Sequence, residues 1–360
     1  MRAAMKRTYV IAEAGVNHNG NADLAFKLID IAVEAGADAV KFQTFKADSL
    51  ATVSAPKCGY QLATTDQHES QQAMLKRLEL PYDLHVELLA YCQKKNIDFL
   101  STAFDVESLF FLDRELNLPQ FKVPSGEITN GPLLLEFART KKPLILSTGM
   151  STLGEIEQAL SVIAFGLTDG SAPSLSAFKK AYLSEEGQRA LRETVSLLHC
   201  TSLYPAPIDQ VNLKAMETMC QSFGLPVGYS DHTAGISISI AAVARGAQII
   251  EKHFTLDKSL PGPDHKASLE PHELNQMIKS IREVEAALGD GVKKPTLAEL
   301  DTLTVVRKSL AASSDLMQDQ LVDEENINIL RPGTGKSPMY YWDILGQKIK
   351  NDIRQGELIE

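Results

Sequence analysis

The sequence contains few cysteines, and no two of them form a CxxC pair. The four present, Cys58, Cys92, Cys200 and Cys220, are widely separated in a chain of 360 residues. A disulfide-stabilised fold has a much denser cysteine pattern, so this class of protein is excluded. We interpret the four cysteines as reduced thiols of a cytoplasmic protein.

Long hydrophobic runs are also missing. The apolar run at residues 9–12 is too short for the hydrophobic segment of a signal peptide, and no later run approaches the length of a transmembrane helix. Positive charge is scarce as well, since the net charge is −10. A nucleic-acid-binding or membrane-surface protein is therefore not expected, although a local group of lysines can still bind a small anionic substrate.

The nucleotide-binding motifs GxGxxG and the P-loop are absent, and residues 333–335 are interpreted as a tight turn. His199 and Cys200 are adjacent, but alternation along a strand points them to opposite faces. A Cys/His nucleophile pair is therefore disfavoured.

What is present is an ordinary globular composition, 44% hydrophobic and 23% charged, with a regular alternation of strand and helix patterns. Eight such units run from residue 9 to the helix that begins at Glu270 and Pro271. Eight units over roughly 280 residues are typical of a (β/α)8 TIM barrel rather than an open doubly wound sheet. We predict this α/β barrel at residues 1–290, with an irregular and then helical insertion at residues 166–193 whose role the sequence does not indicate.

The character of the sequence changes after the barrel. Residues 291–300 predict a linker, and residues 301–360 combine short strand patterns and turns with little helical periodicity. We expect a small, mostly-β second domain there.

Polar residues gather where the predicted strands end. The carboxyl ends of TIM-barrel strands converge on one mouth, where the chemistry of such enzymes lies. Lys41 and Lys122, with several hydroxyl groups, suit a phosphate, although barrel aldolases also carry a Schiff-base lysine at a strand end. The strand-end residues are Glu13, Lys41, Gln43, Thr102, Lys122, Ser125, Glu127, Ser147, Ser202, Tyr204, Ser230, His232 and His253.

Two of these residues, His232 and His253, are one strand–helix–strand unit apart, which would bring both imidazoles to the same edge of the sheet. They are interpreted either as ligands of one metal ion or as hydrogen-bonded core residues. Glu13 and Glu127 are candidate acid–base groups, and nearby lysines with a metal would lower the pKa of Glu13 and favour a base. Glu127 is equally suited to pairing with a lysine or a helix N-terminus, and Asp264 either reaches the mouth or forms a turn.

Several ordered motifs resemble those of the sialic acid synthases, and together they cover nearly the whole chain. The motifs are residues 11–20 (IAEAGVNHNG), 40–44 (VKFQT), 121–127 (FKVPSGE), 146–150 (LSTGM), 199–205 (HCTSLYP), 229–233 (YSDHT), 251–255 (EKHFT) and 261–264 (PGPD). The C-terminal segment resembles the antifreeze-like (SAF) domain of that family, with residues 331–335 (RPGTG) in its characteristic loop.

The resemblance implies a synthase that condenses phosphoenolpyruvate with an N-acetylmannosamine-type sugar and releases phosphate by C–O cleavage. It implies a divalent metal on His232 and His253, most often Mn²⁺ with Mg²⁺ or Co²⁺ as alternatives, and Glu13 as the residue that activates water. It also implies a domain-swapped homodimer, in which the SAF domain of each chain caps the other barrel and Arg331 reaches the N-acyl group of the sugar. The implied contacts are Lys41, Thr102, Lys122, Ser125, Ser147 and Ser230 for phosphoenolpyruvate, and Gln43, Tyr204 and Asp264 for the sugar. Ser202 departs from the pattern, because the best-known members carry an asparagine there.

N-acetylneuraminate synthase is the leading interpretation. The alternative within the family is N,N'-diacetyllegionaminate synthase, whose sugar, 2,4-diacetamido-2,4,6-trideoxymannose, lacks the 6-hydroxyl and needs a less polar pocket at one end. We expect residues 47–72 to determine which of these two sugars the protein binds. Outside the family, the alternatives are a Schiff-base aldolase that uses Lys122 and a non-enzymatic ice-binding protein, which would leave the paired histidines and lysines without a role.

Overall fold

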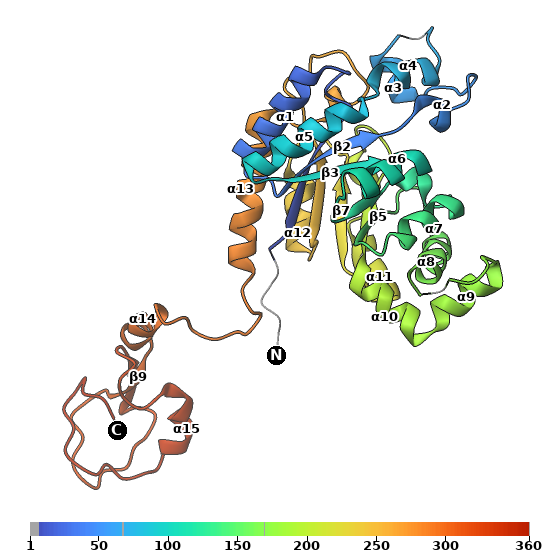
Figure 1. The fold of residues 1–360 in the computed structure, drawn as a ribbon. Coiled ribbons are helices and arrows are strands. Elements are labelled where there is room, and N and C mark those ends of the chain that lie inside the picture. Colours follow the sequence, from blue (N-terminus) through green and yellow to red (C-terminus); the bar gives the residue numbers. More distant parts are fainter. Residues whose placement is uncertain (1–6, 67, 169, 360) are drawn as a thin grey trace. The chain divides into compact units, whose positions relative to one another are not determined.

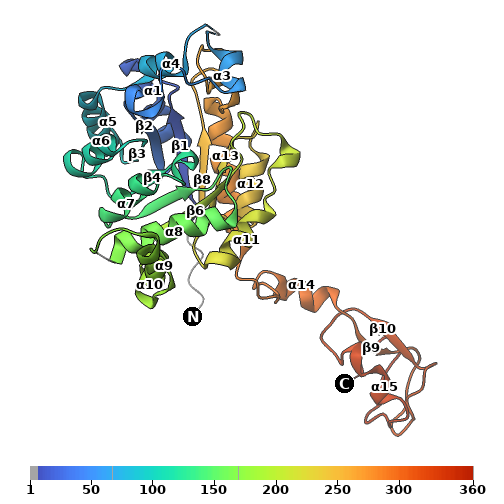
Figure 2. The same cartoon turned by 90° about the vertical axis from the view of Figure 1, so that its right-hand side faces the viewer.

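The structure is a computed structural model that describes residues 7–66, 68–168 and 170–359 (Figure 1). Its contacts divide the chain into two compact units, Met1–Gly289 and Asp290–Glu360. The first unit is a closed barrel of parallel strands with helices outside, which confirms the predicted TIM barrel (Figure 2).

The barrel closes because its first and last strands pair in register, with Glu13 opposite His253. Side chains alternate along each strand, so every second residue faces the barrel interior. The strands are β1 (Tyr9–Gly15), β2 (Ala39–Thr44), β3 (Asp98–Ala103), β4 (Phe121–Val123), β5 (Leu144–Ser147), β6 (Val195–Cys200), β7 (Val227–Asp231) and β8 (Ile249–His253).

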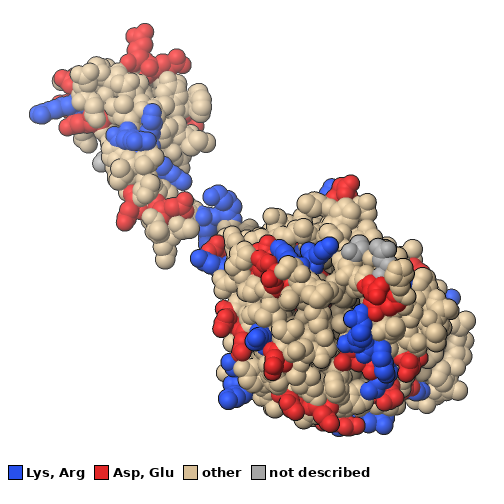
Figure 3. Space-filling view, turned by 90° about the horizontal axis from the view of Figure 1, so that it is seen from above, with Lys and Arg blue, Asp and Glu red and all other residues tan. Residues whose placement is uncertain are grey.

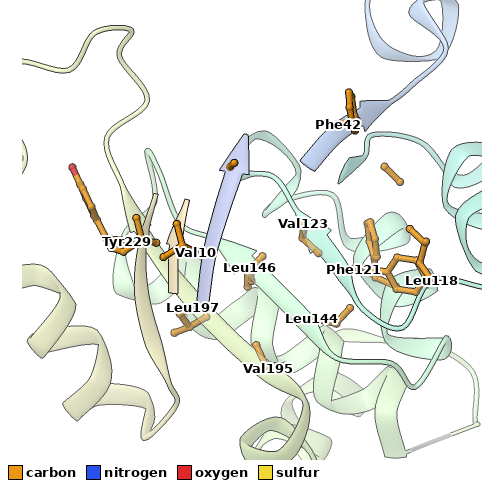
Figure 4. Close-up of a cluster of buried hydrophobic side chains, with 14 of the residues drawn as sticks. Val10, Phe42, Leu118, Phe121, Val123, Leu144, Leu146, Val195, Leu197 and Tyr229 are labelled. Atoms are coloured by element: carbon orange, nitrogen blue, oxygen red, sulfur yellow. The ribbon is translucent and has the colours of Figure 1, made fainter. Parts of the chain in front are cut away.

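Two apolar layers follow from this alternation. The interior layer contains Ile11, Leu100, Ile145 and Leu198, which fill the barrel below its mouth. The outer layer lies between the strands and the helices, and Figure 4 shows part of it. A residue two positions beyond an interior residue therefore also faces inward, and this places the strand-end side chains in the mouth. The outer residues labelled in the figure are Val10, Phe42, Leu118, Phe121, Val123, Leu144, Leu146, Val195, Leu197 and Tyr229.

Local signals set the helix ends. Asn21 caps the first helix by accepting a hydrogen bond from the Leu24 amide, and Gly36 ends it in the left-handed conformation. Glu270 and Pro271 begin the last barrel helix, as predicted. The barrel helices are α1 (Ala22–Ala35), α5 (Tyr82–Lys95), α6 (Val106–Phe110) with the π-helical turn η1 (Phe111–Glu115), α7 (Gly131–Arg139), α8 (Leu153–Thr168), α11 (Lys214–Phe223), α12 (Ser237–Ala244) and α13 (Pro271–Leu288).

Two segments form additional helices outside the regular strand–helix pattern of the barrel, and we call each of them an excursion. The segment between β2 and α5 folds into α2 (Ala47–Leu50), α3 (Gly59–Thr64) and α4 (Gln71–Leu78), of which the sequence predicted only the last. The predicted insertion at 166–193 is helical, because α8 extends to Thr168 and is followed by α9 (Leu175–Leu183) and α10 (Glu185–Thr194). Helices α9 and α10 pack against α8.

The second unit has a small core of its own. Its antiparallel pair β9 (Ser309–Ala312) and β10 (Ile327–Leu330) agrees with the expected β character. Helix α14 (Glu299–Val306) was not predicted, and it begins inside the segment expected to be a linker. Its apolar residues Leu300, Val305 and Val306 are exposed, so the helix buries no core face within its unit. The short elements η5 (Pro338–Tyr340) and α15 (Tyr341–Ile344) complete the unit.

Acidic and basic side chains are interspersed on the face seen in Figure 3, without an extended basic patch there. Within the described residues, no helix is both long enough and apolar enough to span a membrane.

Candidate active site

A cavity of about 390 Å³ opens at the carboxyl ends of the barrel strands. The barrel topology brings strand ends that are far apart in sequence to this one place. The predicted site residues that line it are Glu13, Lys41, Gln43, Thr102, Lys122, Ser125, Ser147, Ser202, Tyr204, Ser230, His232, His253 and Asp264.

Two lysines and two carboxylates form the charged floor of the cavity. The Lys41 ammonium group lies 2.7 Å from Glu13 Oε2 and donates a 2.9 Å hydrogen bond to Thr102 Oγ1. Glu251 lies between the lysines, with its oxygens 3.7 Å from Lys41 Nζ and 3.6 Å from Lys122 Nζ. Ser230 donates a 3.0 Å hydrogen bond to the same carboxylate. All four charged side chains are almost fully buried.

Glu251 was missed as a site residue from the sequence. The signal that could have identified it is its position two residues before His253, because alternation on β8 points both side chains into the barrel.

The two carboxyl groups have opposite pKa shifts. Burial raises the pKa of Glu13 to about 7, against the opposing attraction of Lys41. Burial alone would also raise the pKa of Glu251, but Lys122 and Lys41 outweigh it and lower that pKa to about 2. The sequence predicted that lysines together with a metal lower the pKa of Glu13. Among the protein groups alone, burial outweighs the lysines, and the sequence does not show this burial. Glu13 is the carboxyl group suited to exchanging a proton near neutral pH.

Small polar groups surround the Lys122 side of the cavity. The Gly149 amide donates a 2.9 Å hydrogen bond to Ser125 Oγ, which lies 3.1 Å from Cys200 Sγ. Within the described part of the chain, the buried Ser147 hydroxyl has no hydrogen-bond partner. A buried hydroxyl that faces a cavity in this way is available to an oxygen-rich ligand.

The two histidines stand side by side in the mouth, with ring centroids 5.7 Å apart. His232 Nδ1 lies 2.8 Å from the Thr201 carbonyl oxygen. Because a carbonyl can only accept, Nδ1 carries the proton and Nε2 keeps its lone pair. Burial lowers the pKa of His232 to about 4 and lowers that of His253 as well, so both rings are neutral.

This pair is chemically suited to a divalent metal. Neutral imidazoles are common metal ligands, and His253 Nδ1 is buried without a hydrogen-bond partner among the described residues. The same residues contain no cluster of three or more His, Cys, Asp or Glu side chains placed to bind one ion. A metal held here would therefore have two protein ligands and would take its remaining ligands from water or substrate.

An aromatic column stands beside the histidines. The ring centroid of Tyr204 lies 4.2 Å from that of His232, and the Tyr60 ring packs against Tyr204 at a tilt of 31°, with centroids 4.9 Å apart. Tyr60 comes from α3 and was not itself predicted as a site residue, although residues 47–72 were expected to determine the choice of sugar. Asp264 completes this side, and burial raises its pKa to about 6.

An apolar part of the cavity lining also comes from the segment between β2 and α5, which contributes the polar Gln61 and Gln71 as well. Leu50, Met74 and Leu78 line the cavity here together with Val16 and Phe104. They belong to one small hydrophobic cluster that is separate from the main core. The excursion thus contributes both apolar and aromatic surface to the mouth.

Two further predicted site residues have hydrogen-bond partners of their own. Glu127 is missing from the described residues that line the cavity, and its carboxylate accepts a 2.7 Å hydrogen bond from Asn130 in the turn before α7. Arg331 belongs to the second unit, where its Nε donates a 3.0 Å hydrogen bond to the Val306 carbonyl. The sequence did place His199 correctly, since it bonds to the Val211 carbonyl while Cys200 lines the cavity.

Comparison with known proteins gives two family matches. Residues 28–293 match the NeuB family, and residues 307–360 match the SAF domain. The N,N'-diacetyllegionaminic acid synthase of Campylobacter jejuni subsp. jejuni is 50% identical over 355 residues, which is 99% of each chain. The protein of the same name from Legionella pneumophila is 44% identical over 99% of this chain and 94% of its own.

A solved structure supports the same assignment. It is the N-acetylneuraminic acid synthetase of Leptospira borgpetersenii in complex with citrate, with 33% identity and a TM-score of 0.66. The match covers 83% of this chain and 90% of that one.

Proposed function

The chain belongs to the NeuB family of sialic and legionaminic acid synthases, and from this premise we propose that it is an N,N'-diacetyllegionaminate synthase. It would condense phosphoenolpyruvate with 2,4-diacetamido-2,4,6-trideoxymannose and release phosphate. The sequence alone favoured N-acetylmannosamine as the sugar. The apolar part of the cavity lining and the two relatives of that name now favour the deoxy sugar.

The observation that carries the proposal is the contrast between two parts of the cavity lining. Lys41, Lys122 and the free Ser147 hydroxyl suit the carboxylate and phosphate of phosphoenolpyruvate. The apolar part that contains Met74 and Leu78 suits a methyl group, which the deoxy sugar carries where N-acetylmannosamine has a hydroxymethyl group. Burying a hydroxyl against such a surface without a partner is unfavourable.

The proposed reaction makes one carbon–carbon bond and breaks one carbon–oxygen bond. A new bond joins C3 of phosphoenolpyruvate to the aldehyde carbon of the sugar, and water adds to the cation left at C2. The former aldehyde oxygen takes up the proton that the water gives up and becomes a hydroxyl. The tetrahedral intermediate then breaks the C2–O bond to its phosphate, and the C2 hydroxyl loses its proton to the leaving phosphate, so that the ketone forms. A divalent ion on His232 and His253 would supply polarisation of the aldehyde oxygen.

Glu13 is the residue we assign to the proton of the attacking water. Its raised pKa lets it accept this proton at neutral pH, and Lys41 at 2.7 Å holds its carboxylate in place. Gln43 Nε2 lies 3.5 Å from the other oxygen of Glu13, so the group is held on both sides. Glu251 stays ionised and keeps both lysine side chains at the floor.

Two other functions remain to be tested beside this one. N-acetylneuraminate synthase is the second candidate, because the Leptospira structure of that activity also matches most of the chain. A Schiff-base aldolase is the third, since burial lowers the pKa of Lys122 and so increases the fraction of neutral amine.

The test is phosphate release from phosphoenolpyruvate and Mn²⁺ with each of the two sugars, with and without EDTA. We expect EDTA-sensitive release that is at least about tenfold faster at kcat/KM with the 2,4-diacetamido sugar, which corresponds to about 1.4 kcal/mol. Preference for N-acetylmannosamine would overturn the sugar assignment and leave the reaction class intact. No release with either sugar, together with borohydride trapping of substrate on Lys122, would establish the aldolase instead.

A further inference from the structure

We propose that the buried ion pair between Asp231 and Lys252 is a positioning device for the two histidines. The inference rests on the proposed metal-assisted function and names two residues that the proposed function does not use. Each of them directly neighbours one histidine in the sequence, Asp231 before His232 and Lys252 before His253.

The alternation of the strands explains the arrangement. His232 and His253 face the cavity, so Asp231 and Lys252 face outward, toward the layer of helices. Their Cα atoms are direct partners in the β7–β8 register. Lys252 Nζ lies 3.1 Å from Asp231 Oδ2, and both side chains are fully buried. One ion pair thus ties together the two strand ends from which the histidines project.

The remaining hydrogen bonds of the pair fix the backbone around His232. Asp231 Oδ1 accepts 2.8 Å hydrogen bonds from both the amide and the hydroxyl of Thr233. Lys252 Nζ donates to the Thr233 carbonyl, and Ser239 from α12 donates a 2.6 Å hydrogen bond to Asp231 Oδ2. Asp231 and Thr233, on either side of His232, are therefore held on the helix-facing side of the barrel. The His232 ring itself is held by the Thr201 carbonyl.

Stability alone does not account for this pair. Two charges buried in a protein lose more solvation than an isolated pair regains, and apolar side chains of similar volume are often equally stable in their place. The hydrogen bonds of Asp231 and Lys252 to Thr233 instead fix the backbone on either side of His232 in one conformation. The described part of the chain offers the histidines no third His, Cys, Asp or Glu ligand, so a metal there would depend on how these two rings are held.

The test compares Mn²⁺ binding, followed by the loss of the free-ion electron paramagnetic resonance signal, in the full-length protein and its variants. Asp231→Leu combined with Lys252→Met removes the pair without leaving a lone buried charge, and Asp231→Asn is the conservative variant. The matched control is Asp113→Leu with Lys142→Met, which removes an ion pair of 2.8 Å on the helical side of the barrel. Urea unfolding of each variant checks that it folds.

We expect the double variant at Asp231 and Lys252 to unfold at a urea concentration close to wild type and to bind Mn²⁺ about 10–100-fold more weakly. The control pair should leave Mn²⁺ affinity unchanged.

Wild-type Mn²⁺ affinity in the folded double variant would overturn the inference while the proposed function stands. Wild-type protein that binds no Mn²⁺ and still releases phosphate would overturn the metal site and this inference, whereas absence of phosphate release would overturn the proposed function.

Discussion

The ring of Tyr60 packs against the ring of Tyr204, with centroids 4.9 Å apart and a tilt of 31°, and this contact joins the segment after β2 to the histidine side of the cavity. We predict that Tyr60→Ala raises the KM for the sugar about tenfold, because an aromatic contact of this kind contributes about 1 kcal/mol and the loss also loosens Tyr204. Tyr60→Phe keeps the ring and should stay within about twofold of wild type. Steady-state kinetics with each substrate varied in turn gives the answer. An equal rise in the KM for phosphoenolpyruvate would show that α3 shapes the whole mouth rather than the sugar side.

Removal of the proposed metal ligands should abolish turnover and leave the fold intact. His253→Ala and His232→Ala should each lower kcat by about 10³-fold or more, as expected for loss of the polarising ion. Neither residue belongs to the apolar core, so circular dichroism spectra should match wild type. His199→Ala is the control, because this ring bonds to the Val211 carbonyl on the other side of β6. Near-wild-type rates in His253→Ala would disprove the metal assignment.

Gly149 is a position where the cavity has no space for a side chain. A Cβ there would lie 2.7 Å from Cys200 Sγ and 2.9 Å from Ser125 Oγ, and would overlap Ser202 Oγ. Gly149→Ala should therefore displace the hydroxyl groups assigned to phosphoenolpyruvate, raise its KM severalfold and lower the free energy of unfolding by about 1–3 kcal/mol. Gly154→Ala in α8 meets its nearest atom at 3.9 Å and serves as the control. An unchanged KM in a stable Gly149→Ala protein would place the substrate elsewhere.

A buried histidine outside the metal pair predicts acid sensitivity. Burial lowers the pKa of His265 to about 4, and its ring bonds to Thr255 Oγ1 and Asn19 Oδ1. Since the unfolded chain takes up this proton near pH 6.5, the unfolded state binds more protons than the folded state between pH 6.5 and 4. The contribution to stability is therefore complete above pH 6.5 and is lost as the pH falls toward 4.

The measurement is urea unfolding across that pH range. Allowing for solvent screening, we expect wild type to lose up to about 2 kcal/mol more than His265→Gln between pH 7 and 4.5. His272→Gln, a change at an exposed histidine on α13, is the control. Parallel stability curves for wild type and His265→Gln would refute the prediction.

The barrel and most of the cavity could be predicted because their signals are local. Caps such as Asn21 and Gly36 mark each unit, and parallel register then fixes which residues reach the mouth. Glu251 could have been predicted in the same way, since it lies on the same face of β8 as His253. Tyr60 could not, because its place depends on how an irregular excursion packs against distant strands.

Charge and burial explain the other differences. The sequence shows that lysines accompany Glu13 but not that the carboxyl group is fully enclosed, and burial decides the direction of its pKa shift. Glu127 is the last residue of the motif at residues 121–127, but a hydrogen bond from Asn130 holds its carboxylate in the turn before α7. A strand-end position therefore indicates a candidate, and the side-chain partners decide whether it faces the substrate.

Arg331 provides the sharpest test of the expected domain-swapped homodimer. If the SAF domain of each chain caps the barrel of the other, Arg331→Ala should raise the KM for the sugar about tenfold or more and leave the dimer intact, because a charge-assisted hydrogen bond is worth about 1.5–3 kcal/mol. Light scattering checks the dimer.

The decisive experiment mixes two defective proteins under conditions that exchange subunits. One carries Arg331→Ala with an intact barrel, and the other carries His253→Ala with an intact Arg331. In a swapped dimer the intact barrel receives an intact Arg331 from its partner, so half of the sites in each mixed dimer regain the wild-type KM for the sugar. If Arg331 acts on the barrel of its own chain, every site keeps one of the two defects and mixing restores nothing. Two Arg331→Ala samples mixed together control for effects of the exchange procedure.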